Sequence, residues 1–377
     1  MIFVWCFSHV YGAYMIVLGS SGSIGLNALS LARENGLQID ALACKSSVAI
    51  LNSQIEEFAP KLVYIDDDSL KSQINHKFVF SKKDGIEKFL KACDEQSHGA
   101  KLINAFVGFD GLIPSLKALE LGFDLALANK ESLVAGGKFL DCSKITPIDS
   151  EHFGLKFMLK DRPKIHRLII TASGGAFYNR EISALAGASV EDALKHPNWS
   201  MGAKITIDSA TMVNKLFEIV EAFWLYGCQN IDAYIERKSL IHALIEFQDG
   251  SSTAHISKPD MRLAIAHAIG LGEQRVIENL DIKLLQNITL EPIDLDRYKA
   301  FSLKDELLQN PQIGAIINAA NDEIVAGFLG KRVNFISISG AIFDALDKFG
   351  SFKLDSVESV IEINQKVREY IKDRYMV

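Results

Sequence analysis

Short apolar stretches alternate with segments of helical periodicity over the first part of the chain. The stretches that we interpret as strands are 15–19, 38–44, 62–66, 102–107 and 124–128, and the helical segments between them are 23–35, 47–57, 85–95 and 112–121. Strands and helices that alternate at this spacing are typical of a parallel sheet with helices on both faces. A further short strand at 143–150 leads out of this part. We therefore predict an α/β fold with a Rossmann-like N-terminal domain over 15–148.

The pattern changes after this domain. Apolar strands such as 167–171 and 239–247 flank loops rich in Gly and Ser, which predicts a central α+β catalytic domain at 149–270 with a mainly antiparallel sheet. Residues 271–304 show little periodicity and are interpreted as a linker. Residues 305–377 are helical throughout, with runs at 318–329, 336–348 and 356–375, and predict a C-terminal helical bundle.

The N-terminal 14 residues stand apart from this pattern. They are largely apolar, and the first Lys or Arg of the chain is Arg33, so the basic start of a secretory signal is missing. We interpret residues 1–14 as an extension before the first strand, with Met15 as an alternative start of the native chain. A membrane anchor is the competing interpretation.

Composition and charge argue against several classes of function. The chain has 377 residues, of which 48% are hydrophobic, and a net charge of −7, which argues against broad contact with nucleic acid. Five Cys without a CxxC spacing suggest neither a disulfide framework nor a zinc ribbon and fit a reducing cytoplasm. A few local Lys and Ser groups still suffice to bind a small anion.

A glycine loop follows the first predicted strand. The sequence GSSGSIG places Gly19, Gly22 and Gly25 between a strand and a helix, where the backbone can turn tightly and approach a pyrophosphate. An ordinary strand–helix turn is the alternative. The expected cofactor contacts in this loop are Gly19, Ser20, Ser21, Gly22, Ser23 and Ile24.

The end of the second strand indicates which dinucleotide binds. Asp40 lies near the offset expected for an acid that binds the ribose of NAD, but it stands at the beginning of the strand, far from the ligand end. The other end carries Lys45, Ser46 and Ser47, which suit a phosphate and favour NADP, with the contacting residue left open.

Another polar segment follows a later strand of the same sheet. Asn129, Lys130 and Glu131 stand at its C-terminal end, where open α/β sheets bind ligands. Lys130 could orient a substrate oxygen, and Glu131 could accept a hydrogen bond from a ribose or nicotinamide edge. A helix start with a surface Lys–Glu pair is the alternative.

Two carboxylates leave the first domain together. In an extended segment Asp149 and Glu151 share one face, and such a pair in a cleft favours a hard cation, Mg²⁺ or Mn²⁺. We choose Glu218 as the third ligand, with Glu221 as its rival. An Asp-x-Glu pair by itself is more often a solvated turn.

The block His196–Glu218 (HPNWSMGAKITIDSATMVNKLFE) combines a loop with a helix. We predict a helix that begins near Ser209 and points Asn214, Lys215 and Glu218 toward one site. Ser209, at the helix start, could bind a phosphate together with Ser173 of the segment Ser173-Gly174-Gly175. Helix capping and a plain turn are the alternatives.

The first seven residues of this block are predicted to form a mobile flap. His196–Gly202 contains Pro, Gly and the aromatic Trp199, which would cover an apolar part of a ligand and exclude water. Alternatively, Trp199 plugs the loop into the body. We interpret His242, His255 and His267, in apolar surroundings, as structural, and His152, beside Glu151, as a support for the carboxylates.

Taken together, these motifs resemble one family. The chain is similar to 1-deoxy-D-xylulose 5-phosphate reductoisomerases over residues 15 to about 375. The motifs that carry the resemblance are Gly19–Gly25, Ala128–Ser132, Asp149–His152, Ser173–Gly175, the 196–218 block, Pro259–Arg262 and Asn318–Asn321. The resemblance implies an NADPH- and Mg²⁺- or Mn²⁺-dependent homodimer of non-mevalonate isoprenoid biosynthesis. It would rearrange the carbon skeleton of its sugar-phosphate substrate and reduce the resulting aldehyde to 2-C-methyl-D-erythritol 4-phosphate.

The resemblance also implies roles for individual residues. The metal ligands would be Asp149, Glu151 and Glu218; the substrate-binding set would be Ser150, Glu151, Ser173, His196, Ser209, Asn214, Lys215 and Glu218; Lys130, Glu151 and Trp199 would be catalytic; and Lys45, Ser46, Asn129, Glu131 and Gly202 would join the glycine loop in binding the cofactor. Met201 resembles the neighbour of the flap residue. Two residues depart from the family pattern: Leu216 stands in place of Gly, and Ala176 in place of Pro.

Two rival functions use parts of the same pattern. A metal-dependent NADP oxidoreductase acting on a sugar phosphate without rearrangement needs the same ligands but less enclosure, so the flap argues against it. A nucleotide-sensing regulatory protein has no need for three carboxylates beside a phosphate site.

Overall fold

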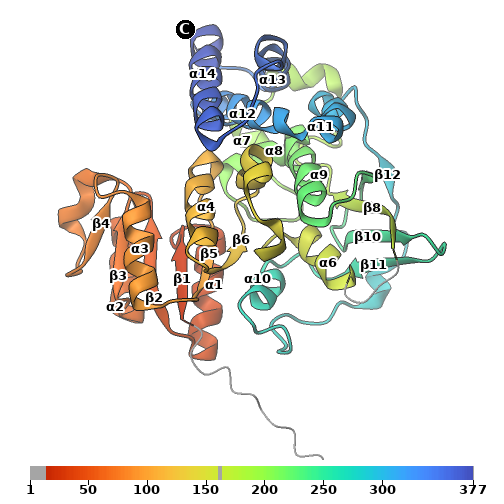
Figure 1. Ribbon diagram of the computed structural model, residues 1–377. Helices are drawn as coiled ribbons and strands as arrows, with labels where there is room; N and C mark the ends of the chain where they lie inside the picture. Colours follow the sequence, from red (N-terminus) through yellow and green to blue (C-terminus); the bar gives the residue numbers. More distant parts are fainter. Residues whose placement is uncertain (1–13, 160–163, 377) are drawn as a thin grey trace, which may run out of the picture.

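The computed structural model describes residues 14–159 and 164–376. The predicted extension at 1–14 therefore lies outside the described residues, apart from Tyr14. Figure 1 shows three regions: a sheet with helices around it on the left, a group of helices at the top, and a second sheet at the right. No helix of the described ranges is long and apolar enough to cross a membrane.

The N-terminal region is a seven-stranded sheet in the order β4-β3-β2-β1-β5-β6-β7 in which every pairing is parallel. Its strands are β1 Met15–Leu18, β2 Ile39–Cys44, β3 Leu62–Ile65, β4 Val79–Ser81, β5 Lys101–Asn104, β6 Asp124–Leu127 and β7 Ile145–Pro147. Its helices are α1 Ser23–Asn35, α2 Val48–Phe58, α3 Ile86–Gln96, α4 Leu112–Glu120 and α5 Lys130–Gly136. The predicted Rossmann-like parallel sheet is confirmed; the short β4 was not predicted.

The strand order reverses beside β1, and this reversal locates a ligand crevice. β2 lies on one side of β1 and β5 on the other, so the loops that follow β1 and β5 diverge at the carboxyl edge of the sheet. The glycine loop follows β1, and residues 105–107 follow β5; both segments line the main pocket of the molecule.

The second sheet is mixed, in the order β11-β10-β8-β9-β12. Its strands are β8 Ile165–Ala172, β9 Ile231–Ile235, β10 Ile241–Phe247, β11 Ser252–Ile256 and β12 Glu291–Pro292. β8 and β9 pair in parallel and the other three pairs are antiparallel. β12 comes from the segment interpreted as a linker, so residues 271–304 also contribute to the sheet.

The helices of the middle and C-terminal parts surround the pocket and close the top of the molecule. They are α6 Ser150–Leu159, α7 Val190–Ala193, α8 Ala203–Thr211, α9 Val213–Tyr226, α10 Arg262–Ala268, α11 Lys304–Gln309, α12 Gly314–Leu329, α13 Ser337–Phe349 and α14 Val357–Tyr375. The 3-10 helices are η1 Asp68–Gln73, η2 Gly108–Gly111, η3 Gly137–Phe139, η4 Cys142–Lys144, η5 Ile182–Gly187, η6 Ile282–Leu285, η7 Lys299–Leu303 and η8 Pro311–Ile313.

Helix α12 is the centre of the C-terminal bundle. It packs against α13, α14 and α5, and Ala319 and Ala320 on it are fully buried. Small residues at these positions allow neighbouring helices to approach closely. Because α5 carries Lys130 and Glu131 at its start, α12 supports a helix that leads directly into the pocket.

Candidate active site

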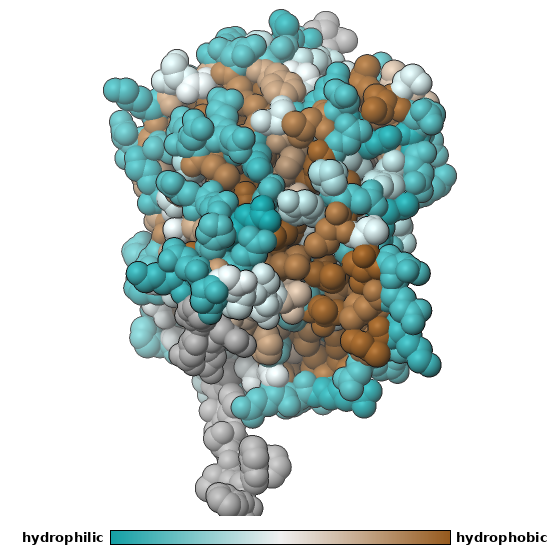
Figure 2. Space-filling view, turned by 90° about the vertical axis from the view of Figure 1, so that its right-hand side faces the viewer, coloured by the Kyte–Doolittle hydropathy of each residue, from teal (hydrophilic) through white to brown (hydrophobic). Residues whose placement is uncertain are grey.

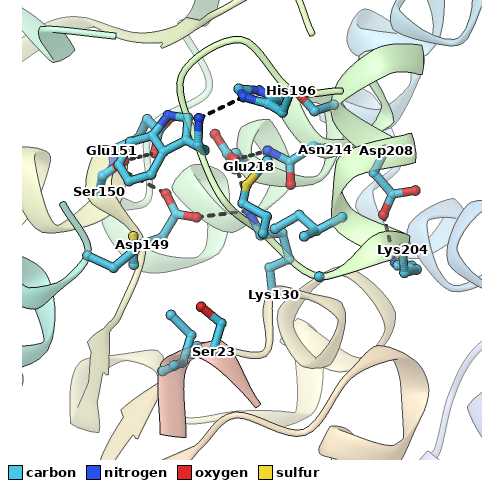
Figure 3. A pocket seen from close by; sticks show the side chains of 18 of the residues that line it. Ser23, Lys130, Asp149, Ser150, Glu151, His196, Lys204, Asp208, Asn214 and Glu218 are labelled. Atoms are coloured by element: carbon cyan, nitrogen blue, oxygen red, sulfur yellow. Dashed lines mark hydrogen bonds and ion pairs between the residues drawn. The ribbon is translucent and has the colours of Figure 1, made fainter. Parts of the chain in front are cut away.

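One pocket of about 350 Å³ collects side chains from the first sheet, from the second sheet and from the helices of the middle part of the chain. It is lined by the glycine loop, the loop after β5, the start of α5, the β7–α6 turn, the end of β8 and much of the 196–218 block. Figure 3 shows the labelled side chains pointing toward one another from these elements. The motifs separated along the sequence therefore form a single site.

Three carboxylates lie together in this pocket. Oxygens of Asp149, Glu151 and Glu218 lie within 4.8 Å of one another, and Glu218 is almost completely buried. The local geometry differs from the prediction, because Ser150 begins α6 and the segment is not extended. Instead, Asp149 precedes the helix and its Oδ1 accepts a hydrogen bond from the Glu151 N–H at 3.2 Å. Asp149 thus caps the turn that carries Glu151.

Two buried ammonium groups hold the carboxylates in place. Lys130 Nζ lies 2.8 Å from both Asp149 Oδ2 and Glu218 Oε1. Lys215 Nζ lies 2.7 Å from Glu151 Oε1 and also pairs with Glu218. Three carboxylates and two ammonium groups leave one formal negative charge, so a cation can still bind here.

The pKa values of this cluster are strongly perturbed. Burial and the neighbouring Glu218 raise the pKa of Glu151 to about 8. Burial opposes ionisation of Asp149 as well, but the attraction of Lys130 outweighs it and holds the pKa of Asp149 well below its ordinary value. Burial would lower the pKa of Lys130, but Asp149 and Glu218 raise it well above the ordinary value. Both lysines are therefore protonated at neutral pH, and Glu151 is the group that titrates.

Glu221, the rival ligand, faces elsewhere. Its carboxylate lies 3.2 Å from Nε2 of His152, and both side chains are buried. His152 therefore pairs with Glu221 one helical turn from Glu218, instead of supporting Asp149 and Glu151 through a direct contact.

A second group of polar side chains forms the other end of the pocket. His196 Nε2 lies 3.0 Å from Ser173 Oγ and 3.1 Å from Ser209 Oγ. Ser173 Oγ also accepts a hydrogen bond from the Gly175 N–H at 3.2 Å. Burial lowers the pKa of His196 to about 4, so its imidazole is neutral at pH 7. Its Nδ1 accepts hydrogen bonds from the Asn198 and Trp199 N–H groups, so Nε2 carries the ring proton and donates toward the two hydroxyls. Two hydroxyls and an imidazole at one point suit an anionic oxygen.

The predicted helix start near Ser209 is wrong. Ser209 lies near the C-terminal end of α8, and a new helix, α9, begins at Val213. Met212 separates the two helices in a left-handed conformation with φ of 65°, which is uncommon for a residue other than Gly. The break directs Ser209 toward His196, while Asn214, on the first turn of α9, donates a hydrogen bond to Glu218.

Asn214 and Lys215 consequently contact the carboxylates directly. Asn214 donates to Glu218, Lys215 pairs with Glu151 and Glu218, and both residues line the pocket that also contains the Ser173–His196–Ser209 group. Leu216, which departs from the family pattern, is fully buried in the hydrophobic core and does not line the pocket.

The loop 196–202 borders the pocket and is only partly buried. The ring of Trp199 lies 6.2 Å from the ring of His242 in an edge-on arrangement. Asn198 Nδ2 donates to Arg237 O at 2.7 Å and to Ser239 Oγ at 2.8 Å, which fastens the loop to the β9–β10 turn. His242, interpreted as structural, is buried but also lines the pocket beside Trp199.

The glycine loop fits a dinucleotide. Gly19 has φ of 82°, and a Cβ on it would come within 2.4 Å of Ala105 O; a Cβ on Gly25 would lie 2.3 Å from Gly19 O. A Cβ on Gly22 would make only an ordinary van der Waals contact, 3.4 Å from Gly19 O. Gly22, Ser23 and Ile24 line the pocket, whereas Gly19, Ser20 and Ser21 lie behind them. Ser20 Oγ is buried without a hydrogen-bond partner among the described residues.

The other predicted cofactor contacts divide into two groups. Glu131 and Gly202 line the pocket, but Asn129 does not. Asn129 is buried and donates to Phe106 O and Gly108 O, both at 2.8 Å, so it holds the loop after β5.

The residues expected at the NADP phosphate lie outside the pocket. Lys45 and Ser46 are exposed beyond the end of β2, where Lys45 Nζ lies 3.5 Å from Asp110. Asp40 is buried at the other end of the strand and pairs with Lys61, as expected for a residue remote from the ligand.

Sequence reasoning missed two charged residues of the pocket wall, Lys204 and Asp208. They stand four residues apart on α8 and form an ion pair of 2.9 Å. In the sequence this spacing is indistinguishable from a surface pair on a helix. Only their position inside the 196–218 block hinted at the site.

A parallel sheet whose dinucleotide-type glycine loop shares one pocket with a carboxylate cluster is typical of a class of α/β oxidoreductases. Residues 15–137 match the sequence profile of 1-deoxy-D-xylulose 5-phosphate reductoisomerase, and residues 145–226 and 256–370 match two profiles of its C-terminal domains. The chain belongs to the 1-deoxy-D-xylulose 5-phosphate reductoisomerase family.

Individual relatives agree with this assignment. The chain is 60% identical over 358 residues to the 1-deoxy-D-xylulose 5-phosphate reductoisomerase of Campylobacter fetus. The aligned region covers 95% of this chain and 99% of the relative. It is similar to a crystal structure of DOX-P reductoisomerase in complex with NADPH, fosmidomycin and magnesium, with a TM-score of 0.87, 30% identity, and 96% and 98% of the two chains covered. The Zymomonas mobilis enzyme in complex with NADPH gives a TM-score of 0.83 at 31% identity, with the same coverage.

Proposed function

We propose that this chain is the reductoisomerase that converts 1-deoxy-D-xylulose 5-phosphate to 2-C-methyl-D-erythritol 4-phosphate with NADPH and Mg²⁺ or Mn²⁺, in non-mevalonate isoprenoid biosynthesis. The observation that carries the proposal is the meeting, in one pocket, of the three carboxylates, the Ser173–His196–Ser209 group and the glycine loop. Each part binds one component of the reaction, and family membership supplies the substrate.

The carboxylate cluster is the proposed metal site. Asp149, Glu151 and Glu218 are hard oxygen donors, the type that Mg²⁺ and Mn²⁺ prefer, and their residual negative charge favours a divalent cation. When bound, such a metal polarises the substrate's oxygens as a Lewis acid during cleavage and reformation of the carbon–carbon bond. Lys130 and Ser150, which line the same wall, would orient the carbonyl and hydroxyl end of the substrate.

The other end of the pocket is the proposed phosphate site. The side chains of Ser173, Ser209 and His196 form hydrogen bonds with one another, and Asn214 and Lys215 line the same pocket. A phosphate held here supplies binding energy away from the reacting carbons. Trp199 would then cover the substrate and exclude water from the aldehyde.

The glycine loop and Glu131 are the proposed contacts to NADPH, which supplies the hydride. The space above Gly22 allows a pyrophosphate to approach the backbone and the N-terminus of α1. Lys45 or Ser46 would reach the 2′-phosphate at the outer end of the same crevice, and Gly202 would contact the cofactor from the flap.

We also propose a homodimer in the cytoplasm, as the family resemblance implies. Figure 2 shows a broad apolar area on the side of the molecule where Figure 1 places α6, β10 and β11. On this side Phe157 of α6 and Ile256 of the edge strand β11 are exposed by 59% and 40%. An apolar area beside a free sheet edge supports contact with a second copy.

The test is NADPH oxidation with 1-deoxy-D-xylulose 5-phosphate, with and without Mg²⁺, followed by mass and NMR analysis of the product. We expect metal-dependent turnover to the branched product. Turnover to an unbranched alcohol would instead establish a simple sugar-phosphate oxidoreductase, and no turnover by the parent protein would refute the proposed function.

A further inference from the structure

A second charged cluster lies behind the cofactor side of the pocket. At its centre is Lys204, the second residue of α8, which directly follows the flap. Lys204 Nζ lies 2.8 Å from Glu131 Oε1, 2.9 Å from Asp208 Oδ2 and 3.2 Å from Asp322 Oδ1. Lys204, Glu131 and Asp208 line the pocket, whereas Asp322 stands behind them on α12. Figure 3 shows the pair of Lys204 and Asp208 at the side of the pocket.

Asp322 also holds the loop that follows β5. Its Oδ2 accepts a hydrogen bond from the Phe109 N–H at 3.3 Å and pairs with Arg368 of α14 at 2.5 Å. Gly108 adopts φ of 71° beside it, and a Cβ there would lie 2.9 Å from Asp322 Oδ2. The close approach of this loop to Asp322 therefore depends on Gly108.

Asn321, next to Asp322 on α12, forms a second contact between α12 and α8. Asn321 Nδ2 donates to Asp208 Oδ1 at 2.8 Å. Asn321 closes the segment Asn318–Asn321, which marked the family resemblance but has no part in the proposed chemistry. Adjacent residues of α12 thus bind both charged groups of α8.

Three segments of the pocket wall are linked to Asp322. The loop 105–109 leads to the Phe109 N–H, which donates to Asp322; Lys204, at the start of α8, pairs with it directly; and the start of α5 is linked to it through the ion pair of Glu131 with Lys204. We propose that Asp322 is a positioning residue for NADPH: the C-terminal bundle holds the cofactor wall in its binding geometry through Asp322 and Lys204. This inference rests on the proposed function, because it takes NADPH as the ligand.

The attraction between Lys204 and its three carboxylate partners stabilises the contact between α8 and α12. Lys204 is largely buried, and burial alone would lower its pKa, but the combined attraction of Asp208, Glu131 and Asp322 raises the pKa well above the ordinary value. Removing the charge of Asp322 leaves Lys204 with two partners, both on the pocket side. We expect Lys204 and the loop 105–109 to shift, and Glu131 to lose its fixed orientation.

The test measures NADPH binding without sugar phosphate, by the change in protein fluorescence, on Asp322→Asn and the parent protein. We expect the Kd for NADPH to rise about tenfold in Asp322→Asn, while the affinity for Mg²⁺ stays within twofold, because Asp322 contacts none of the three metal carboxylates. Asp322→Glu, which restores the charge, should return the Kd to within threefold of the parent value.

Asp344→Asn is the matched control. Asp344 also lies in the C-terminal bundle and binds Arg374 and Tyr375 at 2.6 and 2.8 Å, but it has no link to the pocket wall. It should lower the melting temperature without changing the Kd for NADPH. An equal rise in Kd in both variants would overturn the proposal, because loss of stability would then explain it.

Arg368→Met serves if Asp322→Asn does not fold. Arg368 is 30% exposed; it pairs with Asp322 Oδ2 and also contacts Asn364 and Glu323, none of which lines the pocket, so this variant should fold and raise the Kd about threefold. An unchanged Kd in the folded Asp322→Asn, or in Arg368→Met where it must substitute, overturns the inference. A parent protein that neither binds NADPH nor turns over would refute the proposed function instead.

Discussion

Glu218→Gln gives the sharpest test of the metal site, because it removes one charge and keeps the shape. Glu218 is almost fully buried and contacts Lys130, Lys215 and Asn214. The formal charge of the cluster changes from −1 to 0, so the two ammonium groups lose a partner and a divalent cation loses an anionic ligand. A neutral oxygen remains in the same place, which separates the loss of charge from the loss of shape.

Two effects determine how far the metal affinity falls in Glu218→Gln: the loss of a negative charge beside the metal, and a change in the pKa of Glu151. At an effective dielectric constant of 20, two unit charges 4 Å apart interact by about 4 kcal/mol, part of which the ammonium groups already offset. We therefore expect metal affinity to fall by about 100-fold or more, equivalent to about 2.7 kcal/mol. Burial and, after it, the charge of Glu218 raise the pKa of Glu151 to about 8, so removal of that charge should lower the pKa.

The pKa of Glu151 predicts how the metal affinity depends on pH. In the parent protein Glu151 must lose a proton to bind a metal, and below its pKa of about 8 each pH unit should weaken binding about tenfold. Affinity therefore rises as pH increases from about 6 to 8, with release of a proton. In Glu218→Gln this rise should be smaller, because Glu151 is already ionised over more of the range.

Calorimetric titration with Mn²⁺ at several pH values measures both effects. Glu221→Gln is the control, since Glu221 lies on the same helix, is equally buried and pairs with His152. It should leave metal affinity nearly unchanged. If Glu218→Gln binds Mn²⁺ as tightly as the parent protein and turns over undiminished, Glu218 is not a ligand and the electrostatic reasoning fails.

Three further predictions concern the cofactor crevice and stability. Gly25→Ala places a Cβ 2.3 Å from backbone and should lower the melting temperature markedly, whereas Gly22→Ala has room and should fold normally but weaken NADPH binding about tenfold or more; equal thermal stability of the two variants would contradict this. Lys45→Met should raise the Kd for NADPH roughly fivefold and leave that for NADH unchanged, since an exposed ion pair contributes about 1 kcal/mol; equal effects on both dinucleotides would exclude a contact with the 2′-phosphate. Burial lowers the pKa of His255 from 6.5 to about 4, so the unfolded chain takes up its proton first and His255 reduces stability as pH falls through this range. In urea unfolding between pH 7 and 5, His255→Gln should therefore lose less free energy of unfolding than the parent protein, and parallel losses would refute the assignment.

The sequence predicted the features that depend on residues close together in the chain. Apolar strands at regular spacing and a glycine loop after the first of them predicted the parallel sheet and its crevice, because both depend on neighbouring residues. The assembly of Asp149, Glu151 and Glu218 was predicted correctly as a group, although by the wrong local geometry. Ser150 begins a helix there, and Asp149, which caps its first turn, is a residue type that favours a helix start but is equally common in turns.

Other features depend on tertiary contacts and could not be predicted. The choice between Glu218 and Glu221 follows from His152, which takes Glu221 as its partner. The break at Met212 has no local signal, since neither Gly nor Pro marks it, and the packing around the pocket must impose its conformation. Lys204 looks like an ordinary helix charge until Asp322, more than a hundred residues later, lies beside it.

The two lysines among the carboxylates bear on how the protein matures in the cell. Lys130 and Lys215 act as resident counter-ions, so the carboxylates can be buried during synthesis before any metal arrives. Folding and metal acquisition are then separate events, in contrast to small domains that fold only around their ion. If the cluster is the proposed metal site, chelation should therefore leave a folded protein that regains activity when Mg²⁺ or Mn²⁺ is returned.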